Sequence, residues 1–289
     1  MKIMIVHNEY GKFSGEEAVV QGQKALLEQY GHDVCLFTRS SAAIPSMFLG
    51  KLRAFFSGIF NPFARHAFNN FLQIHRPDII HIHNLFPLLS PSILLKCHVQ
   101  RRPVVMTVHN YRLICPNGLF MTGGKICERC AGGREYWCVW NSCEGNFMKS
   151  LGYALRNYSA RFLQCYLKNV TCYAALTYFQ RTKLIDEGYP SEKIFVIPNM
   201  TDLTAKTETE VGNFIGYVGR ISPEKSVDTL ISAAYKCENI PFIAAGSYEK
   251  LPELPKGAPA NFQFLGQLNR PQVEEFITLS RIITLQYLL

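Results

Sequence analysis

Short apolar runs alternate with longer amphipathic stretches along this chain. The runs have the composition of buried strands, while the stretches between them repeat apolar residues at the three- and four-residue spacing of helices. In the first two thirds of the chain, the strand-like runs are residues 1–6, 33–37, 78–83, 103–108, 170–176 and 193–197. Alternating strands and helices predict an α/β fold, with parallel sheets covered by helices on both faces.

A second series of the same kind begins near residue 213. Residues 201–212 are polar and poor in large apolar side chains, which is typical of a linker. The later strand-like runs are residues 214–218, 241–245, 262–265 and 282–289. We therefore expect two Rossmann-like domains, residues 1–200 and a shorter one at 213–289. Within the first, residues 147–168 predict one long helix.

A candidate anion site follows the strand-like run at 214–218. Arg220 and Lys225 bracket a turn in which Ser222 suits a helix N-cap and Pro223 the first helical position. A helix N-terminus presents unpaired N–H groups and about half a positive charge, so the stretch predicts a site for a phosphate-bearing ligand. An ordinary strand–helix junction with solvated basic side chains is the alternative.

Two strand-like runs of the first domain end in a histidine followed by an asparagine. These pairs are His83-Asn84 and His109-Asn110. Histidines at the carboxyl ends of strands can orient or deprotonate a ligand near neutral pH, although a structural hydrogen bond is the alternative for each. The loop after the first strand contains Gly15 but no G-x-G-x-x-G motif, which argues against dinucleotide binding.

Residues 111–146 are unusually rich in cysteine. Glycines between the thiols permit the tight turns that bring zinc ligands together, and four thiolates make a closed, structural zinc site. A set of unrelated reduced thiols is the alternative, and the spacing does not say which cysteine is the spare. The candidates are Cys115, Cys127, Cys130, Cys138 and Cys143.

Residues 47–74 alternate bulky apolar side chains with isolated basic ones. Such a segment fits the surface of an anionic membrane, where each basic residue contributes about 1 kcal/mol. Two core-packing helices that are broken at Asn61-Pro62 are the alternative.

Composition limits the remaining choices. The chain has 289 residues, 48% of them apolar, and a net charge of +8 that is spread along the sequence. This charge favours anionic partners such as nucleotide phosphates or a membrane surface, but it is not the dense basic tail of a nucleic-acid-binding protein. The first strand is too short for a signal peptide and no apolar run reaches the length of a membrane span, so we expect a cytoplasmic protein with mostly reduced cysteines.

Four short segments resemble one enzyme family. They are GYVGR at 216–220, SPEK at 222–225, VIPN at 196–199 and FLG at 264–266. With these segments the chain is similar to the retaining glycosyltransferases of the family 4 or group 1 type, which have the GT-B fold of two Rossmann-like domains facing each other across a cleft. The match is specific around Arg220 and Lys225 and looser in the first domain.

The resemblance implies roles for individual residues of the donor site. Arg220 and Lys225, with Gly219, bind the diphosphate of a nucleotide-sugar donor, and the loop at Ser14 and Gly15 approaches the donor or the acceptor.

It implies further roles at the strand ends of the first domain. His109 sits beside the transferring sugar, and His83 with Asn84 lies on the acceptor side. No metal is needed for the chemistry, so any zinc at the cysteines is structural. The implied activity is transfer of a sugar to a glycan or lipid-linked acceptor during surface polysaccharide synthesis, at the inner face of the membrane.

The chain departs from the family near its end. Family members continue into a helix that carries two glutamates seven residues apart, whereas Glu274 and Glu275 are adjacent and too early to replace them. We therefore expect a truncated second domain, and a non-catalytic remnant that keeps only phosphate or nucleotide binding is the alternative function. A zinc-dependent interaction module is a third interpretation. The sugar, nucleotide and acceptor are left open.

Overall fold

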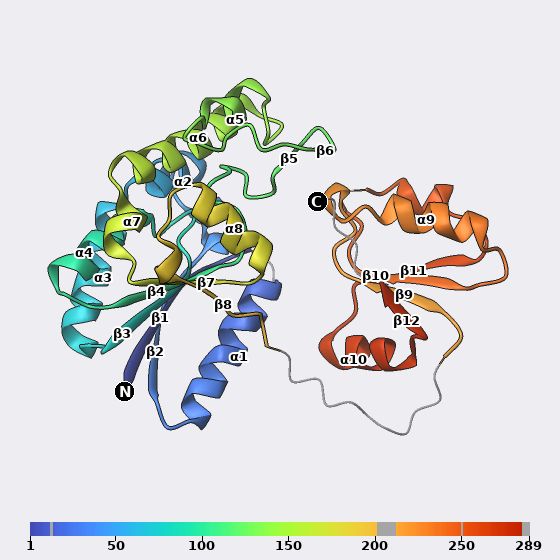
Figure 1. Cartoon of the computed structure of the whole chain (residues 1–289), viewed down its shortest axis with the longest axis horizontal. Coiled ribbons are helices and arrows are strands. Elements are labelled where there is room, and N and C mark those ends of the chain that lie inside the picture. The colour runs from blue at the N-terminus through green and yellow to red at the C-terminus, as the bar shows by residue number, and fades with distance from the viewer. Residues whose placement is uncertain (12–13, 201–211, 250, 285–289) are drawn as a thin grey trace. The chain divides into compact units, whose positions relative to one another are not determined.

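The computed structural model describes residues 1–11, 14–200, 212–249 and 251–284, and the chain divides into two compact α/β units (Figure 1). The first holds Met1–Thr122 and Cys127–Thr201, and the second holds Gly123–Ile126 and Asp202–Leu289. The predicted α/β class is confirmed. Apart from Gly212, the predicted linker lies outside the described residues, and so does the end of the last predicted strand.

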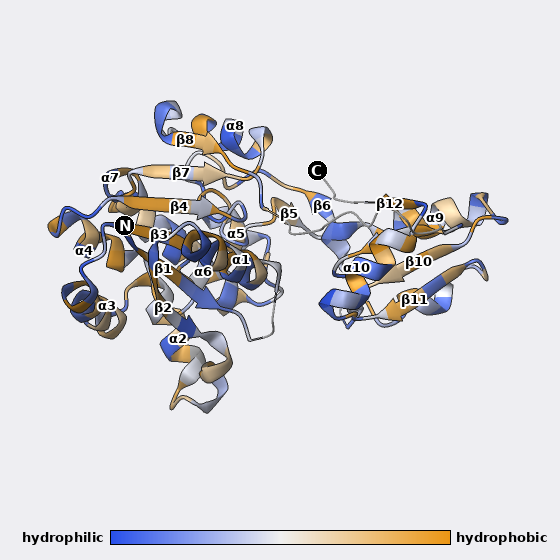
Figure 2. Ribbon diagram, turned by 90° about the horizontal axis from the view of Figure 1, so that it is seen from below, coloured by the Kyte–Doolittle hydropathy of each residue, from blue (hydrophilic) through white to orange (hydrophobic). Residues whose placement is uncertain are grey.

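A six-stranded parallel sheet forms the centre of the first unit. From one edge to the other, its strands are β2 (Asp33–Ser40), β1 (Lys2–Glu9), β3 (Ile79–Asn84), β4 (Val104–Val108), β7 (Cys172–Ala175) and β8 (Ile194–Val196). Strands covered on both faces must be apolar throughout, and the central strands are the most hydrophobic part of this unit (Figure 2). Their side chains form the core with those of the helices.

The helices of the first unit differ from the sequence pattern in one place. They are α1 (Gly15–Gln29), α2 (Gly50–Ile59), α3 (Pro62–His75), α4 (Leu94–Val99), α5 (Tyr136–Trp140), α6 (Phe147–Phe162), α7 (Cys165–Asn169) and α8 (Tyr178–Asp186). The single long helix predicted over 147–168 is wrong, because Gln164 adopts a left-handed φ of 51° and separates α6 from α7. Among the described residues, no helix has both the length and the apolar character to cross a membrane.

The apolar and basic segment at 47–74 forms α2 and α3. The side chain of Asn61 caps α3 and Pro62 occupies its first turn, so the predicted break is confirmed. Helix α3 buries Phe68 and Leu72 in the core, whereas α2 and the residues before it leave Phe48 83% exposed. The core interpretation therefore holds for α3 but not for α2.

A four-stranded parallel sheet forms the second unit, with helices on opposite faces (Figure 1). Its strands, in spatial order, are β11 (Phe262–Gly266), β10 (Phe242–Ala245), β9 (Ile215–Val218) and β12 (Ile282–Thr284), and its helices are α9 (Val227–Lys236) and α10 (Arg270–Leu279). Leu230, Ile231 and Ala234 of α9 pack into its core, on one face at the three- and four-residue spacing of a helix.

The turn after β9 is not the simple helix start that the sequence predicts. Pro223–Lys225 form a single 3-10 turn, and Ser226 then adopts a left-handed φ of 46° before α9 begins at Val227. The hydroxyl of Ser222 makes no capping hydrogen bond. The predicted helix start at Pro223 is therefore confirmed only for one 3-10 turn, and the α-helix itself begins at Val227, after the left-handed Ser226.

Candidate functional site

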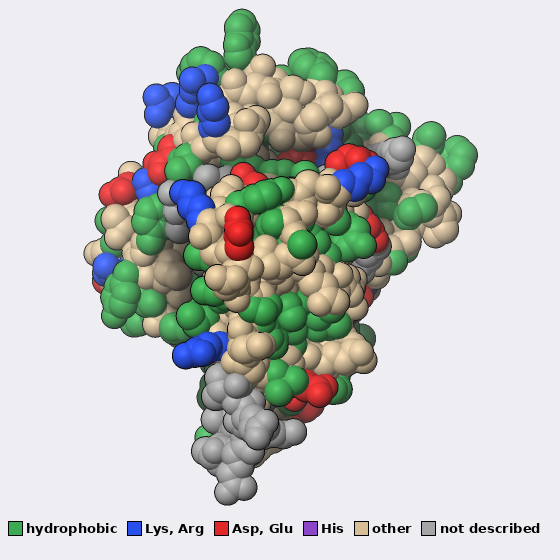
Figure 3. Space-filling view, turned by 90° about the vertical axis from the view of Figure 1, so that its right-hand side faces the viewer, with side chains coloured by type: hydrophobic (Ala, Val, Ile, Leu, Met, Phe, Trp, Pro, Cys, Tyr) green, Lys and Arg blue, Asp and Glu red, His purple; other side chains and the backbone are tan. Residues whose placement is uncertain are grey.

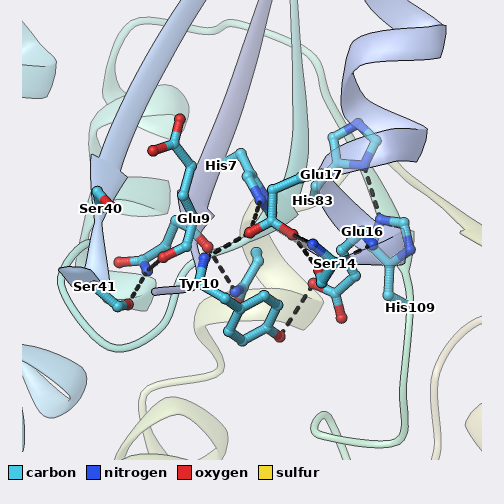
Figure 4. A network of polar contacts seen from close by, with 12 residues as sticks. His7, Glu9, Tyr10, Ser14, Glu16, Glu17, Ser40, Ser41, His83 and His109 are labelled. Carbon is cyan, nitrogen blue, oxygen red and sulfur yellow. Dashed lines mark hydrogen bonds and ion pairs between the residues drawn. The ribbon is translucent and has the colours of Figure 1, made fainter. Parts of the chain in front are cut away.

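The carboxyl ends of β1, β3 and β4 lie side by side at one edge of the first sheet. Along the chain β2 follows β1, yet β1 lies between β2 and β3, so successive strands are added in opposite directions on its two sides. Parallel sheets bind ligands in the crevice outside the carboxyl ends of strands at such a reversal. His7 of β1, His83 of β3 and His109 after β4 meet at this edge, as Figure 4 shows.

The histidines form a closely packed cluster. Nδ1 of His83 lies 2.8 Å from Nε2 of His109, and their rings stack with centroids 5.1 Å apart. On the other side, His81 stacks on His83 at 4.5 Å, while its own Nε2 lies 2.8 Å from Oγ1 of Thr107. The structure therefore brings together both histidines that the sequence singled out, and adds two more from neighbouring positions.

Burial keeps this cluster uncharged at neutral pH. Desolvation lowers the pKa of His81 and of His109 to about 4, with a smaller contribution from the charge of a neighbouring histidine in each case. Desolvation also lowers the pKa of His83 well below its ordinary value. A neutral imidazole can accept or donate a hydrogen bond but cannot repel a cation or neutralise an anion. His109 is therefore suited to orienting a ligand.

The start of α1 closes one side of this edge. Ser14 is its N-cap, and the carboxylate of Glu17 accepts hydrogen bonds from the backbone N–H of Tyr10 at 2.6 Å and of Ser14 at 2.9 Å (Figure 4). Burial alone raises the pKa of Glu17, but hydrogen bonds from the Ser14 hydroxyl and from the Tyr10 N–H hold it below the ordinary value. The first turn is thus satisfied by its own carboxylate, and a role of Ser14 and Gly15 in ligand binding stays a prediction.

Glu16 and Arg112 belong to this edge, although sequence reasoning missed them. Glu16 accepts hydrogen bonds of 3.2 Å from the Tyr10 hydroxyl and from Nδ2 of Asn110, and Arg112 donates one of 3.2 Å to the same hydroxyl. Burial raises the pKa of Glu16, while the charge of Arg112 opposes that shift. Glu16 and Arg112 lie far apart in the sequence, so no spacing could reveal the network; only the position of Arg112 just after a strand end was a signal.

Asn84 connects the ends of two strands. Its Nδ2 donates to the carbonyl of Asn8 at 2.9 Å, and its Oδ1 accepts the backbone N–H of Phe86 at 3.1 Å. The amide is therefore largely occupied by backbone groups. Its predicted place on the acceptor side stays a prediction.

The second unit carries the predicted cation pair. Gly219 and Arg220 follow β9, at the point where the strand order of this sheet reverses between β9 and β12. Nη2 of Arg220 lies 3.3 Å from Oε1 of the buried Glu224, yet its side chain is 66% exposed. Burial and then the positive charge of Arg220 lower the pKa of Lys225. Two cations that repel each other at a strand end favour a bound anion.

Glycine is required beside this pair. A Cβ on Gly246 would lie 1.7 Å from the carbonyl oxygen of Gly219, so the loops after β10 and β9 touch through their backbones. This close approach fixes the position of the chain just before Arg220.

Four of the five candidate cysteines form two hydrogen-bonded pairs of free thiols. A hydrogen bond with Cys130 lowers the pKa of Cys115 to about 7, and one with Cys138 lowers the pKa of Cys143 to about 6. Cys127 joins neither pair. Within the described ranges, no three His, Cys, Asp or Glu side chains are placed to hold a metal ion. Zinc binding by these thiols stays a prediction.

The chain is similar in sequence to one known protein and in fold to several solved structures. A 42.6 kDa protein encoded in the cps region of Klebsiella pneumoniae, itself uncharacterized, is 27% identical over 190 residues, which are 63% of this chain and 44% of that protein. The chain thus spans less than half of that relative. Anabaena HepE in complex with UDP and glucose has a TM-score of 0.59 at 17% identity, covering 99% of this chain and 74% of HepE. A glycosyltransferase from Rickettsia africae has a TM-score of 0.58 at 14% identity, covering 98% of this chain and 72% of its own.

These structural likenesses confirm the predicted fold. A family model described as Glycosyltransferase Family 4 matches residues 13–205, more than half of the sequence. The matched region includes β3 and β4 with His83 and His109, and begins after β1 and its His7. This chain therefore belongs to Glycosyltransferase Family 4.

Proposed function

We propose that this chain takes part in the transfer of a sugar from a uridine-diphosphate donor to a glycan or lipid-linked acceptor in surface polysaccharide synthesis. Family membership supports the reaction class. A complex of Anabaena HepE with UDP-glucose supports the donor, and the cps-region relative from Klebsiella supports the pathway.

The observation that carries this proposal is the cation pair after β9. When a nucleotide sugar loses its sugar, negative charge grows on the departing diphosphate. Arg220 and Lys225 both follow this strand end, and a bound diphosphate would offset the charge of Arg220 that, after burial, lowers the pKa of Lys225. Preorganised charge of this kind is usually the largest contribution to catalysis.

The histidine-lined edge supports a second role in the same reaction. Neutral His109 presents hydrogen-bonding nitrogens rather than a charge, so its part is to orient the sugar or the acceptor. Glu16 and Arg112 share the Tyr10 hydroxyl and hold polar groups of this edge in fixed directions.

The test measures UDP binding and sugar transfer separately. Arg220→Ala and Lys225→Ala should each weaken UDP binding at least tenfold in calorimetry and abolish transfer to an extract containing the acceptor. Arg270→Ala is the matched control, because Arg270 also pairs with a glutamate four residues on, at 3.1 Å, in the same unit. Unchanged UDP affinity in both variants would sink the proposal. UDP binding by the parent chain with no transfer of any sugar favours the alternative, a nucleotide-binding chain without activity.

A peripheral contact with an anionic membrane is part of this proposal, and α2 supports it. A Cβ on Gly152 of α6 would lie 2.6 Å from the ring of Phe55, so α2 lies tightly against α6 through that ring. The same segment leaves Phe48 83%, Leu52 50% and Phe56 58% exposed. Leu52 and Phe56 lie four residues apart on α2 and form an apolar stripe, and Phe48 is exposed just before the helix, separated from it by the left-handed Leu49.

Charge along the sequence favours an anionic membrane as the occupant of this stripe. No Asp or Glu occurs between Asp33 and Asp78, whereas five Arg or Lys residues do: Arg39, Lys51, Arg53, Arg65 and Arg76. An apolar stripe within a purely basic segment fits a bilayer of anionic lipid rather than an acidic or neutral protein.

Vesicle sedimentation tests the contact. The chain should bind vesicles of phosphatidylglycerol and phosphatidylcholine but not of phosphatidylcholine alone, and Phe48→Ser with Phe56→Ser should reduce binding at least fivefold. Tyr30→Ser is the control, since Tyr30 is 74% exposed but lies between Glu28 and Asp33. Equal binding by all three proteins would refute the contact.

A further inference from the structure

A basic cavity of about 500 Å³ opens at the amino ends of β4, β7 and β8, the edge of the first sheet opposite the histidine cluster. Arg101 and Arg102 precede β4, Lys168 precedes β7 and Lys193 precedes β8. His98 also lines it. Every lining residue is described, and none is Asp or Glu.

The walls of this cavity are held in place by backbone and side-chain hydrogen bonds. After α4, the N–H of Arg102 donates to the carbonyl of Cys97 at 3.0 Å, which turns the chain back toward the sheet. The backbone N–H of Val104 donates to Oγ1 of Thr171 at 2.9 Å, which ties the loop before β4 to the loop before β7. Nδ2 of Asn169 donates to the carbonyl of Cys165 at 2.6 Å and closes the end of α7.

The cations of this cavity lack protein partners. In the part of the chain that the structure describes, the side chains of Arg101, Arg102, Lys168 and Lys193 enter no ion pair and no hydrogen bond, and Nε of Arg102 is buried without an acceptor. By contrast, the face in Figure 3 carries both basic and acidic side chains scattered among hydrophobic ones. Glu192, beside Lys193 in the sequence, is exposed and does not line the cavity.

Helix ends do not account for this charge. Cations are common near helix C-termini, and α4 and α7 both end here, but each end carries only about half a negative charge. The two ends therefore offset about one of four formal positive charges. Arg101, Arg102 and Lys193 in addition lie outside both helices. About three positive charges are left without compensation.

We infer that this cavity binds a ligand with two or more phosphate groups close together. Guanidinium groups match phosphate oxygens in a bidentate way, and two of the four cations are arginines. The volume is within the range of small-ligand sites, about 300–1,000 Å³, and exceeds the size of a single phosphate ion. The phosphates come either from a soluble polyphosphate compound or from the headgroups of an anionic bilayer.

The first arm of the test uses inorganic tripolyphosphate and calorimetry. All proteins carry Arg220→Ala and Lys225→Ala, so that the cation pair of the second unit contributes nothing. Arg102→Gln with Lys193→Gln should weaken tripolyphosphate binding at least tenfold, and Lys168→Gln alone at least threefold. Arg76→Gln with Arg129→Gln is the control, because it removes the same charge from exposed arginines outside the cavity. Equal loss in the cavity and control variants, or no binding at all, overturns the inference.

The second arm identifies the source of the phosphates. If the ligand is a lipid headgroup, the cavity variant should lose binding to phosphatidylglycerol vesicles and tripolyphosphate should displace the parent chain from them. If the ligand is soluble, vesicle binding should be the same in the cavity and control variants while tripolyphosphate binding differs. The apolar stripe of α2 is intact in both, so these outcomes are distinct from failure of the membrane contact.

Discussion

The two edges of the six-stranded sheet treat charge in opposite ways. At the carboxyl edge, Glu16 and Arg112 both bind the Tyr10 hydroxyl, and Glu17 accepts the backbone N–H of Tyr10. The histidines of this edge are buried and neutral. At the amino edge, four cations converge on a cavity with no carboxylate. A satisfied network holds groups in fixed directions, whereas uncompensated cations store repulsion that only an anion relieves. The carboxyl edge is therefore suited to positioning a ligand, and the amino edge is suited to binding an anion.

The largest expected effect follows from the neutral histidines. The unfolded chain takes up protons near a pKa of about 6.5, while His81 and His109 stay neutral in the folded state down to about 4. Their contribution to stability is complete above pH 6.5 and is lost as the pH falls toward 4, by about 2 kcal/mol for each histidine at pH 5. Urea unfolding from pH 7.5 to pH 4.5 measures this loss.

A variant separates the histidines from the carboxylates that titrate in the same range. His81→Gln keeps a hydrogen-bonding group beside Thr107 but removes one titration. The pH dependence of its free energy of unfolding should be shallower than that of the parent by about 1.4 kcal/mol per pH unit. An identical pH dependence in both proteins contradicts the neutral cluster.

The next effect concerns the carboxylate that caps α1. Glu17→Ala leaves the N–H groups of Tyr10 and Ser14 without their acceptor, so the free energy of unfolding should fall by about 2 kcal/mol. Glu28→Ala in the same helix removes only an exposed pair with Lys24, and should change it by less than about 0.5 kcal/mol. Chemical denaturation of both variants decides this, and similar losses would show that the edge is not held by Glu17.

Local patterns predicted the fold well. Apolar runs marked the strands because a sheet covered on both faces needs them, and a proline with a preceding asparagine marked the break before α3. The failures are left-handed residues: Gln164 divides the long helix and Ser226 delays α9, and neither is a glycine that would have signalled it. The energy that holds such residues comes from packing that a local pattern does not contain.

The candidate site was predictable only where a strand ends. His83, His109 and Arg220 could be found because parallel strands bring their carboxyl ends together. Glu16 could not, since its partners depend on how α1 lies against the chain after β4. The basic cavity could not be predicted from the sequence for the same reason. Its cations come from three separate loops and form a site only when the sheet brings these loops together.

The smallest expected effect concerns Arg101 at the amino edge, where one substitution should raise stability and weaken anion binding. Arg101 adopts a φ of 52°, a conformation that glycine tolerates better, so Arg101→Gly should raise the free energy of unfolding by about 0.5 kcal/mol and at the same time weaken tripolyphosphate binding. Gln164→Gly is the matched control, because Gln164 has a φ of 51° but lies outside the cavity. Thermal unfolding should show a similar gain for both variants, while calorimetry should show weaker binding for Arg101→Gly alone. A gain with undiminished binding would mean that Arg101 is held in its strained conformation for a reason other than the anion.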